Sequence, residues 1–114
     1  MGRDYIIYAV DFDGTLAKDK GNGNIIPNKD LINHLIKRQL QGNKVILWTC
    51  RFGDSLHEAI MFCKENGLIF DAINDNIDYM KNKMGGFSRK IYADVYIDDH
   101  MINKPKYHVP FTAE

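Results

Sequence analysis

Two carboxylates stand one residue apart in the segment YAVDFDGTLAKD, where an apolar run ends at Asp11 and Asp13. A second acidic pair, Asp98 and Asp99, ends another apolar run, and Thr49 ends a third. Carboxylates that meet from distant parts of a chain repel one another unless a cation or a proton lies among them. Mg²⁺ prefers such oxygen ligands and takes one or two carboxylates together with water and substrate phosphate. The pattern therefore predicts a magnesium site, although one acidic pair alone is typical of a solvent-facing turn.

These side chains need a scaffold that brings the ends of several strands together. Apolar runs predict strands at 5–10, 44–49, 69–74 and 91–97, and amphipathic stretches predict helices at 28–42 and 55–67. Asn28 is the expected N-cap of the first helix, and Ser55 with Glu58 is an expected capping box for the second. The alternation of strands and helices favours an α/β fold with a central parallel sheet, in which ligands bind beyond the carboxyl ends of the strands.

The composition limits the classes of protein that remain. A chain of 114 residues has the size of one compact domain. Fifteen basic and fifteen acidic residues balance, so no global charge attracts nucleic acid or an anionic membrane. No apolar run approaches the roughly 20 residues that cross a bilayer, and no membrane partner is expected. The cysteines, Cys50 and Cys63, form neither a disulfide framework nor a metal-ligand set, which is typical of a cytoplasmic protein.

Four motifs occur in a recognisable order: DFDGTL, ILWT, a lysine and VYIDD. This order resembles the motifs of the haloacid dehalogenase (HAD) superfamily of aspartate-nucleophile phosphotransferases, and the match spans Tyr5 to Asp99. The resemblance implies a Rossmann-like three-layer α/β sandwich, formed by residues 1–114 as a single catalytic domain, and a requirement for Mg²⁺. The segments 17–27 and 74–89 are too short for an inserted cap domain of ~50 residues or more, so we expect a capless member.

The first two motifs supply most of the implied chemistry. Asp11 matches the nucleophile that becomes an aspartyl-phosphate, and Asp13 matches the general acid and base. Gly14 and Thr15 complete the same motif and are expected beside the substrate. Thr49 matches the residue that hydrogen-bonds the transferred phosphoryl group.

The acidic motif at the end of the match implies the metal ligands. Asp98 and Asp99 are expected to hold Mg²⁺ together with the carboxylate of Asp11 and the backbone carbonyl of Asp13. We expect Asp98 to bind the ion directly and Asp99 to act through water or to orient its neighbours. Their order is open, because the two residues are adjacent and of one type.

The sequence offers several candidates for the positive charges around this site. The family uses one ammonium group to offset the charge of nucleophile and phosphate, and Lys90, just before the last predicted strand, has the best position. Lys81 and Lys83 are the alternatives. Arg51, two residues after Thr49, either reaches a substrate phosphate or base or is a solvated loop arginine.

These resemblances imply a Mg²⁺-dependent phosphomonoester hydrolase that acts through an aspartyl-phosphate. Without a cap, its substrate would carry an accessible phosphate, such as a small phosphoester or a nucleic-acid end. A second copy in a homo-oligomer, or the short segment 17–26, could shield the site from water. A nucleotide or polynucleotide-end phosphatase is the alternative that Arg51 and the basic run 81–90 favour. Further alternatives are a receiver-like module phosphorylated on aspartate and a non-catalytic phosphate-binding module.

Overall fold

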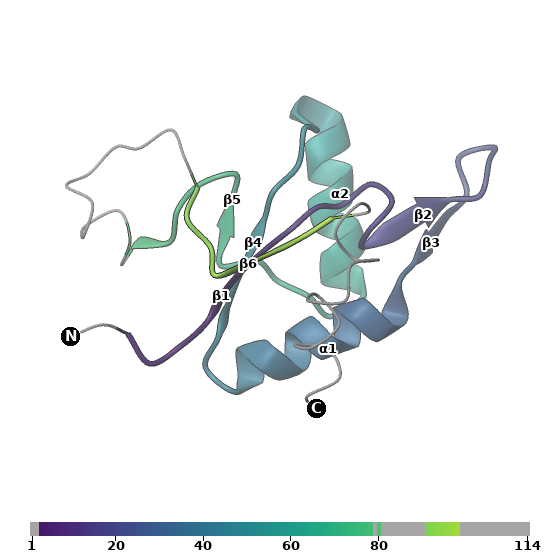
Figure 1. Ribbon diagram of the computed structural model, residues 1–114. Helices are drawn as coiled ribbons and strands as arrows, with labels where there is room; N and C mark the ends of the chain where they lie inside the picture. Colours follow the sequence, from purple (N-terminus) through teal and green to yellow (C-terminus); the bar gives the residue numbers. More distant parts are fainter. Residues whose placement is uncertain (1–2, 79, 81–90, 99–114) are drawn as a thin grey trace.

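The computed structural model describes residues 3–78, 80 and 91–98 (Figure 1). Within this part of the chain the central sheet contains β1 (Ile7–Val10), β4 (Lys44–Leu47), β5 (Ala72–Ile73) and β6 (Val95–Ile97), in the order β5-β4-β1-β6. Each neighbouring pair of strands is parallel. The chain is therefore an α/β protein with a central parallel sheet flanked by helices, as the alternation of elements predicts.

Two helices cover one face of this sheet. Helix α1 (Lys29–Leu40) follows β1 and a short hairpin at residues 17–27, and α2 (Gly53–Glu65) follows β4 (Figure 1). Their buried side chains form one core with alternate residues of the central strands, comprising Leu31, Ile32, Leu35, Ala59, Cys63, Tyr8, Val10, Val45 and Leu47. The period of two along each strand and of 3.6 along each helix selects these residues. Among the residues described, no helix is long and apolar enough to cross a membrane.

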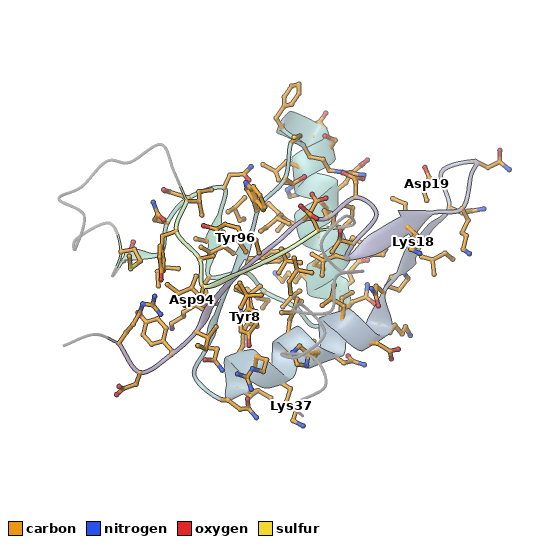
Figure 2. All side chains as sticks on the ribbon, viewed as in Figure 1. Tyr8, Lys18, Asp19, Lys37, Asp94 and Tyr96 are labelled. Carbon is orange, nitrogen blue, oxygen red and sulfur yellow. The ribbon has the colours of Figure 1, made fainter. Side chains whose placement is uncertain are left out.

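The opposite face of the sheet has a smaller apolar layer. Ile7, Ala9 and Ile46 pack there against Ile77, Met80 and Ala93. Of the two tyrosines labelled in Figure 2, Tyr8 belongs to the core beneath the helices and Tyr96 packs against the smaller layer. The central strand β1 and most of β4 are thus buried between side chains from both faces, which explains their continuous apolar runs, whereas β5 and most of β6 at the two sides of the sheet are partly buried.

The two helices begin in different ways. Asn28 caps α1 as predicted, since its Oδ1 accepts the N–H of Leu31 at 3.2 Å. The predicted capping box of Ser55 with Glu58 is wrong. Helix α2 begins at Gly53 after Phe52, which makes no side-chain cap, and the Ser55 hydroxyl donates instead to the Phe52 carbonyl at 2.9 Å. The N-cap lies three residues before the predicted one: the Leu56 N–H donates to the Phe52 carbonyl at 3.3 Å, and Gly53, with φ +56°, tolerates the turn into the helix.

A two-stranded hairpin separates β1 from α1. Its strands, β2 (Ala17–Asp19) and β3 (Ile25–Pro27), pair antiparallel, and Figure 2 shows Lys18 and Asp19 on it. The sequence predicts only a short flap here, because strands of three residues with exposed charges show no alternating pattern. The hairpin occupies segment 17–27, one of the two positions at which a cap domain could be inserted, and it is too small to be one.

Candidate active site

The carboxyl end of β1 brings the first and last acidic motifs to the same edge. Val10 pairs with Ile97 in the parallel register, and the next residue, Asp11, donates its backbone N–H to the Ile97 carbonyl at 2.9 Å. Asp98 follows Ile97 directly, so the two aspartates continue adjoining strands. Both are partly buried. The order of the strands places β1 between β4 and β6, where the chain reverses direction across the sheet, and ligands of open α/β sheets bind at such points.

Thr49 reaches this edge from the other side of β1. Trp48 donates its N–H to the Val10 carbonyl at 2.9 Å, which extends the β1–β4 pairing by one residue. The N–H of Thr49 donates to Asn74 Oδ1 at 2.8 Å. Asn74 has φ +50° and was missed as a site residue in the sequence, although its place directly after β5 is the same signal that selected Thr49.

The turn after Asp11 is closed by its own backbone. The Phe12 carbonyl accepts N–H groups from Thr15, Leu16 and Ala17 at 3.2, 3.0 and 3.1 Å. Gly14 adopts φ +80°, which favours glycine at this point. Thr15 is only 1% exposed, and its hydroxyl is buried without a hydrogen-bond partner among the residues described. Its predicted contact with substrate stays a prediction, as does that of Gly14.

Asp13 and Arg51 form a two-pronged ion pair across this edge. Arg51 Nη2 donates to Asp13 Oδ1 at 2.8 Å, and Nε donates to Oδ2 at 2.9 Å. The hydrogen bonds and the charge of Asp13 raise the pKa of Arg51, against a smaller opposing effect of its burial. Arg51 was predicted to contact substrate or to lie solvated in a loop. The structure instead gives its guanidinium a protein carboxylate as a partner.

Three further contacts fix the Arg51 side chain. Nη1 donates to the carbonyl of Ser55 at 3.0 Å, and the guanidinium lies over the Phe12 ring, 4.7 Å from its centroid. Glu58 is more distant, at 3.9 Å from Nη1. The backbone N–H of Arg51 donates to Thr49 Oγ1 at 3.2 Å. The second motif is thereby joined to the first through one side chain.

The donor set at this edge suits magnesium by its chemistry. Among the residues described, no three His, Cys, Asp or Glu side chains gather in a metal-binding group. The described carboxylates on adjoining strands are Asp11 and Asp98, and Mg²⁺ in phosphoryl-transfer sites typically uses one or two carboxylates, with water and phosphate completing its shell. The residues present therefore fit this ion. The predicted roles of Asp99, Lys90, Lys81 and Lys83 lie outside the described residues.

The chain matches no protein-family model and no curated protein. It is similar to a solved structure, that of a conserved protein coded by a locus from Bacteroides thetaiotaomicron. The two share 31% sequence identity, and the superposition has a TM-score of 0.75 over 97% of this chain and 93% of the other. That protein is known as a conserved protein without a stated activity, so the similarity bears on fold and ancestry. The chain belongs to the same family as this conserved Bacteroides protein.

Proposed function

We propose that this protein is a Mg²⁺-dependent phosphomonoester hydrolase of the HAD superfamily that acts through an aspartyl-phosphate on Asp11. The observation that carries the proposal is the backbone hydrogen bond from Asp11 to Ile97, which aligns the DFDGTL motif with Asp98 on adjoining parallel strands. The position of Thr49 beyond the neighbouring strand supports the same assignment. Such a set is unusual for acidic turn residues, because three separate strands end in it.

The proposed chemistry has two displacements at phosphorus. A carboxylate oxygen of Asp11 attacks the phosphorus, the bond to the leaving alcohol breaks, and Asp13 gives that alcohol a proton. Water then attacks the same phosphorus, Asp13 takes its proton, and the bond between phosphorus and Asp11 breaks to release phosphate. Thr49 would hydrogen-bond the transferred group, and the ammonium of Lys90 would offset its charge.

Asp11, Asp98, Asp99 and the Asp13 backbone carbonyl are the groups that would hold Mg²⁺. The bound ion would offset the negative charge of the phosphate and of the two carboxylates at this edge. Arg51 would not be needed for that purpose, since its charge is already opposed by Asp13.

A small phosphoester is the substrate class we favour. The alternative of a nucleotide or polynucleotide-end phosphatase depends in part on Arg51 as a phosphate contact. Arg51 already donates from Nε and Nη2 to the carboxylate of Asp13, which weakens this alternative. The basic run 81–90 still favours that alternative. We place the protein in the cytoplasm, because Cys50 and Cys63 are both free thiols.

Hydrolysis of a nitrophenyl phosphate, with Mg²⁺ and with excess chelator, tests the proposal. We expect turnover with Mg²⁺, loss of turnover on chelation, and no turnover by Asp11→Asn. Asp4→Asn is the matched control, because Asp4 is an exposed aspartate before β1. Full activity of Asp11→Asn would refute the nucleophile. Phosphorylation that is not followed by phosphate release in the native chain would instead identify a receiver-like module, and binding without any phosphorylation would identify a phosphate-binding module.

A further inference from the structure

Arg51 contacts the proposed acid and base more completely than any other described side chain near the β1 edge. Its Nε and Nη2 donate to the two carboxylate oxygens of Asp13 in the parallel arrangement that a guanidinium and a carboxylate favour. A lysine cannot reproduce this arrangement, since its ammonium is a single compact charge. The contact therefore fixes both the position and the plane of the Asp13 carboxylate.

The arginine is the better-anchored member of the pair. Its side chain is 19% exposed, against 60% for that of Asp13. The Ser55 carbonyl holds Nη1, and the Phe12 ring, which is buried and packs edge-on against Phe62, supports the guanidinium from below. These contacts connect Arg51 to helix α2 and to the core. Asp13, by contrast, lies in a turn. The backbone of this turn is fixed by hydrogen bonds, but the side chain of Asp13 is largely exposed to solvent.

We propose that Arg51 is a positioning residue that orients the Asp13 carboxylate for proton transfer, and is not a ligand of the substrate phosphate. The inference rests on the proposed function, because it needs Asp13 as acid and base. An exposed aspartate without a partner samples several χ1 rotamers. Proton transfer requires the carboxylate within hydrogen-bond reach of the leaving oxygen, so each unproductive rotamer lowers the rate.

An ion pair with this exposure is a weak source of stability. Pairs on protein surfaces contribute little to folding, because solvent screens them and ordering two side chains costs entropy. Removal of Arg51 should therefore affect proton transfer more than melting temperature. It should also affect substrates unequally, since a good leaving group needs little protonation and a poor one needs much.

The test compares Arg51→Gln and Arg51→Lys with the native protein on an alkyl phosphate and on a nitrophenyl phosphate. We expect kcat of Arg51→Gln on the alkyl ester to fall by roughly 10- to 100-fold, a part of the ~10²–10⁴-fold that acid and base assistance supplies. On the aryl ester, formation of the phosphoryl-enzyme, measured as the burst of nitrophenol, should change by less than about threefold. KM should stay nearly constant for both, and Arg51→Lys should recover only part of the loss.

A double-mutant cycle and a matched control complete the experiment. In an Asp13→Asn background, Arg51→Gln should cost almost nothing more, because its effect passes through Asp13. Arg3→Gln removes a similar two-pronged pair, with Asp94, at the opposite end of β1. It should lower the melting temperature without changing the ratio of alkyl to aryl rates.

Different results refute different claims. An additive effect of the two substitutions, an increase in KM as the main change, or an increase in kcat would overturn the role of Arg51. If Asp13→Asn itself shows no dependence on the leaving group, the assignment of Asp13, and with it the proposed function, fails first. Melting temperatures of all variants separate these outcomes from loss of folding.

Discussion

The backbone N–H of Asp11 lies 2.9 Å from the carbonyl oxygen of Ile97, which ties the proposed nucleophile to the residue before Asp98. This hydrogen bond continues the parallel β1–β6 pairing past the last paired residues, Val10 and Ile97. The two carboxylates are therefore placed by backbone geometry. Because sheet pairing is cooperative and buried, neither aspartate can move along its strand without disturbing the core between them.

Under the proposed function, this relationship predicts what Asp98 contributes to the binding of Mg²⁺. Asp98→Asn keeps the size and the strand position but removes a negative charge from the edge. The Mg²⁺ concentration for half-maximal turnover should rise by roughly 10- to 100-fold. Substitution of residues that only support metal ligands already lowers metal affinity by this factor. Turnover measured across a magnesium titration gives this value. Asp19→Asn, on the exposed hairpin, is the control, and an unchanged titration for Asp98→Asn would transfer the direct role to Asp99.

The choice among three lysines gives a second prediction. Lys90 lies just before the segment that leads into β6, whereas Lys81 and Lys83 lie farther upstream. An ammonium beside the transferred phosphoryl group stabilises charge that develops during reaction. Lys90→Ala should nearly abolish turnover, while Lys81→Ala and Lys83→Ala should retain most of it. Steady-state rates with the nitrophenyl phosphate decide the matter, and the opposite ranking would assign the role to one of the upstream lysines.

The positions of the strand ends could be predicted from sequence because they depend on local patterns. Runs such as residues 45–47 are apolar and fully buried, and a polar residue follows each run within two positions, so the sequence alone predicts Asp11, Thr49 and Asp98 at one edge. Parallel pairing of neighbouring strands then followed from the helices between them. Asn74 carried the same signal at the weakest strand, which has only two paired residues.

The contacts between side chains could not be predicted in the same way. Arg51 and Asp13 are 38 residues apart, and their pairing depends on the place at which α2 begins and on the Phe12 ring beneath the guanidinium. The sequence favoured a start at Ser55, whereas the extended Phe52 and the glycine after it start the helix earlier. With Phe52 as the N-cap, Ser55 lies in the first turn of α2, where its carbonyl accepts from Arg51, a contact that a start at Ser55 does not indicate.

A third prediction concerns stability and Asp94, which lies just before β6, contacts the amino-terminal segment through Arg3 and is labelled in Figure 2. The carboxylate of Asp94 accepts hydrogen bonds from Arg3 at 2.8 and 3.0 Å, from the Ile7 N–H at 2.7 Å and from the Tyr92 hydroxyl at 2.8 Å. Partial burial alone would raise the pKa of Asp94, but the hydrogen bonds from Arg3, Ile7 and Tyr92 outweigh it and lower that pKa. The carboxylate therefore favours the folded state when it is ionised.

The sign of the pH dependence follows from this lowered pKa. Stabilisation by Asp94 is present above its pKa in the unfolded chain, about 3.9, and is lost as the pH falls through its lower pKa in the folded chain. Asp94→Asn should reduce the free energy of unfolding at pH 7 by about 1.5–3 kcal/mol, the range for hydrogen bonds to a charged group. The difference from the native protein should shrink below about pH 4. Urea unfolding at several pH values measures it, with Asp4→Asn as control, and a difference independent of pH would contradict the role of the charge.

The last prediction separates the two aspartates of the DFDGTL motif, because their proposed roles differ in kind. Asp13→Asn retains the nucleophile and loses the group that activates water, so phosphate transferred from a nitrophenyl ester should remain on Asp11. Turnover on an alkyl ester should fall by about 10²–10⁴-fold. Rapid acid quench followed by mass measurement of the intact protein detects the trapped phosphate, and peptide mapping locates it. Asp11→Asn should show no added phosphate under the same conditions, and a phosphorylated Asp11→Asn protein would show that another residue is the nucleophile.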